Sequence, residues 1–168
     1  VVQQSEVVIF SVPIKDTPAV IRSVLHGVRE DQLLMDVTSI KQPAVEAMLE
    51  SKAQVVGLHP MFRPEVPFDG QTVVVCPVRL TAPDWKTWVV NMLTATRAQI
   101  KWSTPAEHDG YMTTVQVIPH LGNLTSALLI TEAGVSVSES LAFTSPFYRV
   151  MFSLMGRLVS QSPDLYTS

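Results

Sequence analysis

The 168-residue sequence is poor in cysteine and in charge. Its one cysteine, Cys76, leaves no internal disulfide to form. Only 16% of its residues are charged, with 12 Lys and Arg against 15 Asp and Glu, and no basic cluster stands out. The electrostatic drive toward nucleic acid is therefore missing. No apolar run approaches the roughly 20 residues of a membrane helix. We expect a cytoplasmic protein that binds neither nucleic acid nor membrane.

Several sequence motifs are also missing. There is no G-x-G-x-x-G and no P-loop, so nothing in this sequence cradles a pyrophosphate. There is no Cys/His cluster with zinc spacing and no H-E-x-x-H, so we predict no metal site. The sequence opens at Val1 without methionine or signal peptide and soon enters a strand. We therefore expect a fragment of a longer protein, with the glycine-rich phosphate-binding part upstream of Val1.

Hydrophobic residues make up 46% of the sequence, enough for a sizeable core. In the first half, β-branched runs alternate with segments of helical periodicity. Strands are predicted over 7–12, 32–37, 53–58, 72–78 and 99–102, with helices beginning near Thr17 and Pro43 and one spanning 84–98. The β-α-β-α-β order of the first three strands predicts a parallel sheet with helical crossovers, about half of a Rossmann-type domain. Residues 59–71, rich in proline and aromatic residues, are predicted to form a loop.

After residue 103 the strand signals stop. Thr104-Pro105-Ala106-Glu107 is typical of a capping box, and helical segments are predicted to about 131, over 136–143 and from Ser145-Pro146 to about 159. The predicted fold class is therefore α/β followed by all-α. We expect two domains, 1–103 and 104–168.

Polar residues follow the predicted strands at the edge where doubly wound sheets bind ligands. Ser11-Val12-Pro13 follows the first strand, Ser39 the second and His59 the third. If these tips converge, Ser39 and His59 lie within hydrogen-bond reach and can polarise a substrate hydroxyl. The alternative for Ser39 is a helix cap. Lys41 is predicted to be a solvated surface charge.

The helical half offers a second set of polar residues. Asp109, Thr113, Gln116 and His120 share one face of the long predicted helix, which Pro119 is expected to kink. This stripe indicates either a face turned to a cleft or a solvated face. His108, in the first turn, reads as a capping-region side chain.

Two arginines, Arg149 and Arg157, lie on the last predicted helix. Arginine suits bidentate carboxylate recognition, although a surface salt bridge is the commoner outcome. Arg157 lies within an apolar run, which favours a place in a binding site over a place facing solvent.

These motifs together, in this order and spacing, resemble the prephenate dehydrogenases of tyrosine biosynthesis over nearly the whole sequence. The likeness is carried by residues 8–14, 36–41, 57–62, 107–109 with Met112, 115–116 with Pro119-His120, and 145–149 with 156–158. It implies an NAD-binding Rossmann domain followed by a helical domain that forms a homodimer. It also implies the oxidative decarboxylation of prephenate to 4-hydroxyphenylpyruvate. NADP is the alternative cofactor, and tyrosine is a candidate inhibitor.

The resemblance also implies residue roles. His59 takes the hydrogen bond from the C4 hydroxyl of prephenate as hydride leaves, and Ser39 bridges hydroxyl, His59 and nicotinamide. Arg157 holds a substrate carboxylate with support from Arg149. The substrate pocket also includes Gln116 and His120. The cofactor-binding residues are Ser11, Val12, Pro13, Ser39 and Pro60.

Alternatives remain open at this level. The substrate is prephenate, arogenate or 4-amino-4-deoxyprephenate, and His59 favours a hydroxyl over an amine. The alternative to an enzyme is a non-catalytic helical module for dimerisation or sensing. Arg63, where the family usually has a small residue, either contacts an anionic group of the ligand or faces solvent.

Overall fold

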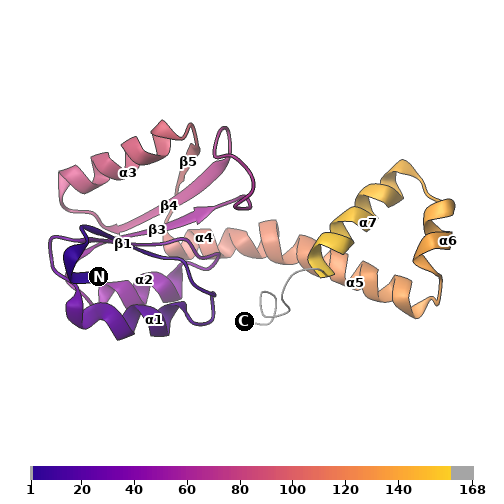
Figure 1. The fold of residues 1–168 in the computed structure, drawn as a ribbon, viewed down its shortest axis with the longest axis horizontal. Helices are drawn as coiled ribbons and strands as arrows, with labels where there is room; N and C mark the ends of the chain where they lie inside the picture. The colour runs from indigo at the N-terminus through magenta and orange to yellow at the C-terminus, as the bar shows by residue number, and fades with distance from the viewer. Residues whose placement is uncertain (1, 160–168) are drawn as a thin grey trace. The chain divides into compact units, whose positions relative to one another are not determined.

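The computed structural model describes residues 2–159, which form five strands and seven α-helices with three short helical turns (Figure 1). The elements of the first half are η1 (Val2–Gln4), β1 (Val7–Phe10), α1 (Thr17–Val24), η2 (Leu25–Gly27), β2 (Leu33–Asp36), α2 (Gln42–Leu49), β3 (Gln54–Pro60), β4 (Thr72–Arg79), α3 (Pro83–Ala95) and β5 (Gln99–Trp102). Those of the second half are α4 (Pro105–Met112), the π-helical turn η3 (Thr113–Val117), α5 (Ile118–Glu132), α6 (Val137–Ala142) and α7 (Pro146–Val159). The predicted fold class, α/β followed by all-α, is confirmed.

The five strands form one sheet in the order β1-β2-β3-β4-β5. Strands β1, β2 and β3 are parallel, and β5 is parallel to β4, but β4 runs antiparallel to β3. The parallel sheet predicted from the order of the first three strands is therefore confirmed for β1, β2 and β3, and β4 departs from it. The cause is the connection: a parallel return needs a crossover, usually a helix, and residues 61–71 contain none. The ladder with β4 also extends β3 through His59 and Pro60, which the sequence had placed in a loop.

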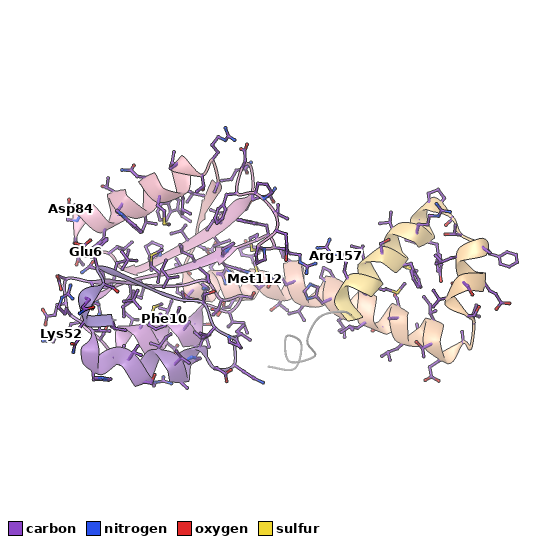
Figure 2. The ribbon with its side chains drawn as sticks, in the orientation of Figure 1. Glu6, Phe10, Lys52, Asp84, Met112 and Arg157 are labelled. Atoms are coloured by element: carbon purple, nitrogen blue, oxygen red, sulfur yellow. The ribbon has the colours of Figure 1, made fainter. Side chains whose placement is uncertain are left out.

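Apolar side chains cover both faces of this sheet. On one face Phe10, Leu34 and Val55 pack with buried residues of α1 and α2, and Figure 2 shows Phe10 beneath the sheet. On the other face, Val56 and Val75 are among the residues that pack against α3. Successive residues such as Val55 and Val56 alternate between the faces, as the pleat requires. This packing on both faces fixes the positions of β1, β2 and β3, and with them the edge of the sheet at which these three strands end.

The helices after β5 begin and end close to their predicted limits. Glu107 N donates to Thr104 Oγ1 at 3.2 Å, so the hydroxyl half of the predicted capping box forms. The turn before Pro119 is π-helical, a local irregularity at the proline, which cannot donate a backbone hydrogen bond.

The chain divides into two compact units, the first ending at Tyr111 and the second beginning at Met112. Helix α5 packs against α7 within the second unit. Across the part of the chain that the structure describes, no helix is both long and apolar enough to cross a membrane.

Candidate functional site in the first unit

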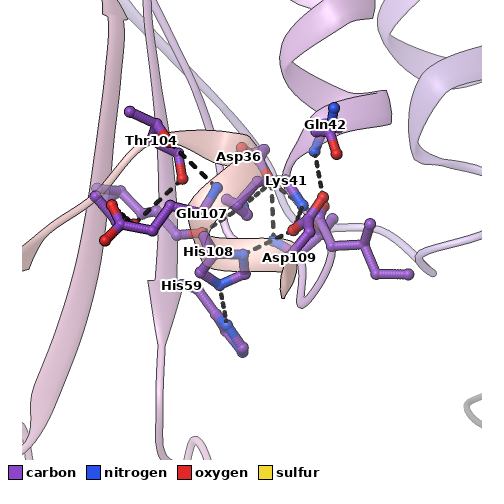
Figure 3. Close-up of polar contacts among 12 residues, drawn as sticks. Asp36, Lys41, Gln42, His59, Thr104, Glu107, His108 and Asp109 are labelled. Carbon is purple, nitrogen blue, oxygen red and sulfur yellow. Dashed lines mark hydrogen bonds and ion pairs between the residues drawn. The ribbon is translucent and has the colours of Figure 1, made fainter. Parts of the chain in front are cut away.

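A buried ion pair lies beside the carboxyl ends of β2 and β3. Lys41 and Asp36 are both fully buried, and the Lys41 ammonium donates to Asp36 Oδ2 (Figure 3). The same ammonium donates to the carbonyl of Leu58 at 2.6 Å. Thr38 completes the cluster, because its backbone N–H donates to Asp36 Oδ2 at 3.0 Å. Burial lowers the pKa of Lys41, and the adjacent Asp36 carboxylate opposes this shift.

The prediction that Lys41 is a solvated surface charge is therefore wrong. The physical reason is the pair of acceptors, Asp36 and the carbonyl of Leu58, that the folded chain brings to its ammonium. Gly57 makes room for the cluster: a Cβ there would lie 3.0 Å from Lys41 Cδ and 3.2 Å from Asp36 Oδ1. Glycine at this position thus allows β3 to pass directly over the ion pair.

Two buried histidines meet next to this ion pair. His59 Nδ1 lies 2.9 Å from His108 Nε2, and the two side chains are 3% and 1% exposed. His59 comes from the end of β3 and His108 from the first turns of α4. His108 Nδ1 in turn lies 2.7 Å from Asp109 Oδ1. The chain of contacts therefore runs from His59 through His108 to Asp109, as Figure 3 shows.

Asp109 connects this line of contacts between side chains to the start of helix α2. Its Oδ1 accepts the backbone N–H of Lys41 at 2.8 Å, and its Oδ2 accepts that of Gln42 at 2.9 Å. The first N–H groups of a helix have no partner within the helix, and a carboxylate there is favoured by the helix dipole. Asp109 therefore caps α2 from a distant part of the sequence, and α2 in turn holds Asp109 in place.

The environment of His59 disfavours its protonated form. Burial, the neighbouring His108 and the Lys41 ammonium lower its pKa to about 3, while Asp109 acts in the opposite direction. His59 is therefore a neutral imidazole at physiological pH, which is the form that accepts a proton or a hydrogen bond.

This shift predicts a pH-dependent stability. Unfolding returns His59 to its ordinary pKa of 6.5, so the unfolded chain binds an extra proton between that value and about 3. Stability therefore falls as the pH is lowered through this window, by about 1.5 kcal/mol between roughly pH 6.5 and pH 5. Urea unfolding of the wild-type chain and of His59→Asn at both pH values measures it. Equal pH slopes for the two proteins would contradict the assignment.

The only cysteine is not a nucleophile candidate. Cys76 is buried in β4 opposite Gly57, and burial raises the pKa of its thiol to about 11. Among residues 2–159, no group of three or more His, Cys, Asp or Glu gathers where it could hold a metal ion.

The residues predicted to contact a cofactor lie near the ends of the parallel strands. Ser11 and Pro13 are exposed and Val12 is half-buried just after β1, and Pro60 is half-buried at the end of β3. Ser39 is exposed in the connection from β2 to α2. The alternative assignment of Ser39 as a helix cap is wrong, because the N-cap position of α2 is Lys41.

The predicted substrate-binding residues belong to the second unit. Gln116 and His120 are half-buried, in η3 and α5, whereas Arg149 and Arg157 are exposed on α7. Their contributions to a site stay predictions. Arg63, in the first unit, is 47% exposed and lies 3.6 Å from the Glu65 carboxylate, so its side chain faces solvent beside an acidic neighbour.

Sequence reasoning missed the parts played by Lys41, His108 and Asp109. Their contacts join residues that are distant in sequence, such as His59 and His108, and no local period reports such pairs. One signal was present: an adjacent His-Asp pair at the start of a helix, in a chain with only four histidines. A neutral buried histidine tied to a carboxylate through a second histidine suits hydrogen-bond acceptance or proton transfer.

Comparison with known families identifies the family to which this chain is similar. The family described as "Prephenate dehydrogenase, nucleotide-binding domain" matches residues 1–102, and "Prephenate dehydrogenase, dimerization domain" matches residues 104–168. The two matches together span almost the whole sequence. The chain thus consists of an α/β unit that matches a nucleotide-binding domain and a helical unit that matches a dimerization domain, and it belongs to the prephenate dehydrogenase family.

Individual relatives agree with this assignment. A probable arogenate/prephenate dehydrogenase of Methanocaldococcus jannaschii is 36% identical over 98% of this chain and 38% of its own length. The T-protein of Haemophilus influenzae is 33% identical over 99% of this chain and 44% of its own length. The chain therefore spans about two fifths of the length of these curated relatives.

Solved structures share the fold. Prephenate dehydrogenase from A. aeolicus, crystallised with hydroxyphenyl propionate and NAD+, superposes with a TM-score of 0.73 at 20% identity, covering 96% of this chain and 59% of that one. Synechocystis arogenate dehydrogenase gives a TM-score of 0.72 at 19% identity, covering 99% of this chain and 62% of that one.

Proposed function

We propose that the chain contributes to an NAD-dependent dehydrogenase that oxidatively decarboxylates prephenate to 4-hydroxyphenylpyruvate. The observation that carries the proposal is His59, a buried neutral imidazole at the end of a parallel strand with one ring nitrogen engaged by His108. Membership of the prephenate dehydrogenase family supplies the reaction class. We likewise propose that the two domains meet near residue 103.

The residues present fit the nicotinamide end of NAD. Two exposed serines, Ser11 and Ser39, follow parallel strands β1 and β2 at the edge where doubly wound sheets bind ligands. Val12, Pro13 and Pro60 add a neutral, mainly apolar surface beside them, and none of the five carries a charge. A structural relative was crystallised with NAD+. When bound, NAD supplies a hydride acceptor, and these residues would hold its nicotinamide end.

His59 has a defined task in this reaction. Its Nε2 accepts the proton of the C4 hydroxyl as the C4–H bond breaks and hydride leaves, so that C4 becomes a ketone. The bond between the ring and its carboxylate then breaks, carbon dioxide leaves, and the electron pair enters the ring. The C4 oxygen regains a proton and the ring becomes aromatic, which makes the sequence irreversible. Ser39 would orient the hydroxyl.

The second unit would supply the groups that bind the substrate carboxylates. Arg157 is proposed to hold one of them, with Arg149 supporting the same helix, because guanidinium groups bind carboxylates in bidentate fashion. Gln116 and His120 would line the pocket, with tyrosine as a candidate inhibitor near His120.

A substrate comparison tests the proposal. The protein, expressed with any natural sequence that flanks residues 1–168, is assayed for NADH formation with prephenate, arogenate and 4-amino-4-deoxyprephenate. We expect prephenate to give the highest kcat/KM, and replacing NAD with NADP to lower it. A higher kcat/KM for arogenate would change the assigned substrate and leave the proposed reaction chemistry the same. The amino analogue is the substrate named for a Streptomyces pristinaespiralis relative that is 27% identical to this chain. A higher kcat/KM for this analogue than for prephenate would contradict the role of His59 as acceptor of a hydroxyl proton. No NAD binding at all would support a non-catalytic module.

A homodimer formed through the helical unit is the second part of the proposal. The matching family is described as a dimerization domain, and α5 leaves Leu121 and Leu128 61% and 66% exposed. These two leucines are seven residues apart and therefore share a helical face. Apolar exposure of this kind is typical of protein interfaces.

We predict that the double substitution Leu121→Glu/Leu128→Glu shifts the protein from dimer to monomer, because it places carboxylates in an apolar interface. Sedimentation equilibrium measures the shift. Val66→Glu, which changes a 37% exposed residue of the first unit, is the matched control and should leave the dimer intact. A double variant that remains as dimeric as the control would rule out this face.

A further inference from the structure

We propose that His108 and Asp109 are positioning residues that fix the tautomer of His59, leaving its Nε2 as the proton acceptor. The inference rests on the proposed function, in which His59 accepts the substrate's hydroxyl proton. Its basis is the line of contacts from the Asp109 carboxylate through His108 Nδ1 and Nε2 to His59 Nδ1, with heavy-atom separations of 2.7 Å and 2.9 Å.

The direction of each hydrogen bond follows from the carboxylate end. An ionised carboxylate only accepts hydrogen bonds, and Asp109 already accepts the backbone N–H groups of Lys41 and Gln42. His108 Nδ1 must therefore carry a hydrogen and donate it to Asp109 Oδ1. In neutral His108 the other nitrogen, Nε2, then bears a lone pair.

The same logic continues to His59. Because His108 Nε2 accepts, His59 Nδ1 must carry the hydrogen between the two rings, and in neutral His59 the lone pair falls on Nε2. A ring nitrogen's protonation is set by the hydrogen bond that its partner nitrogen makes. Were His108 doubly protonated, His59 Nδ1 would have to accept instead, and its Nε2 would hold a hydrogen and be useless as a base.

The far end of this line is held rigidly. Asp109 is fixed by two backbone N–H groups at the start of α2, and the Lys41 side chain below them is anchored on Asp36 and the carbonyl of Leu58. Among residues 2–159, the charged groups near the histidine pair include Asp109 and Lys41, which act on His59, together with Asp36, which pairs with Lys41, and Glu107, which is next to His108 on α4. Both rings are almost completely buried, so water does not compete freely for these bonds.

A pair of variants separates positioning from mere packing. His108→Leu removes the acceptor for His59 Nδ1–H, whereas His108→Gln can keep an acceptor oxygen near the same place. We expect His108→Leu to lower kcat for prephenate about 100-fold with KM little changed, and His108→Gln to stay within about tenfold of the wild type. Glu107→Gln, at an exposed neighbour bonded to Ser103, is the control and should leave kcat unchanged. Equal activity of the Leu and Gln variants would overturn the proposal.

Nitrogen-15 NMR of histidine-labelled wild-type protein tests the tautomers without turnover. We expect both His59 and His108 to carry hydrogen on Nδ1 and a lone pair on Nε2, and Asp109→Ala, which removes the acceptor for His108 Nδ1–H, to abolish this pattern. Hydrogen on His59 Nε2 in the wild type would refute the proposal even if the protein oxidises prephenate. Conversely, the expected tautomers in a protein inactive on all three candidate substrates would contradict the proposed function and leave the tautomer assignment standing.

Discussion

Replacing Lys41 with methionine is expected to lower the free energy of unfolding by about 3–5 kcal/mol, a typical effect of removing one partner of a buried ion pair. Methionine approximates the lysine stem but leaves the buried Asp36 carboxylate without its cation, and it leaves the carbonyl of Leu58 without this donor. Urea unfolding at neutral pH, followed by circular dichroism, measures the loss.

Two further variants make the result interpretable. Lys52→Met removes an ammonium that is 83% exposed and 3.1 Å from Glu30, and it should change stability by less than about 0.5 kcal/mol. Adding Asp36→Asn to Lys41→Met removes the stranded charge and should recover more than half of the lost stability. A Lys41→Met protein as stable as the Lys52→Met protein would contradict the role assigned to the buried pair.

The second large effect concerns His59. We predict that His59→Asn lowers kcat for prephenate oxidation by about 100-fold to 10,000-fold, the usual range for loss of a general base. Asparagine is chosen because its amide can still donate to His108 in place of Nδ1, while no atom replaces Nε2. The rate of NADH formation measures kcat. A separate titration measures NAD affinity, which should equal that of the wild type.

An exposed histidine provides the matched control for this variant. His26 lies on the surface in η2, and His26→Asn should leave kcat within about twofold of the wild type, as surface substitutions usually do. If His59→Asn kept wild-type kcat while binding NAD normally, proton acceptance by His59 would be excluded.

Local patterns in the sequence were sufficient to predict most of the fold. The β-branched run at Val55-Val56 and the proline-led starts of α1 and α2 are short-range signals, and each produced an element where it was expected. The orientation of β4 was not predicted, because it depends on a ladder between distant residues such as His59 and Val74.

The candidate site was only partly predictable for the same reason. His59 was found because strand ends in doubly wound sheets form ligand sites. The burial of Lys41 depends on Asp36 and the carbonyl of Leu58, and the contact of His108 with His59 depends on how α4 packs. A lysine after a strand and a histidine in a first helical turn have no periodic signature that distinguishes such contacts from solvent exposure.

The most direct test of the central claim is a single reaction with prephenate and NAD, catalysed by the protein expressed with any natural flanking sequence. The account predicts one NADH and one carbon dioxide for each 4-hydroxyphenylpyruvate formed, with all three suppressed together in His59→Asn. A folded wild-type protein that binds NAD and prephenate but forms neither NADH nor 4-hydroxyphenylpyruvate would contradict it.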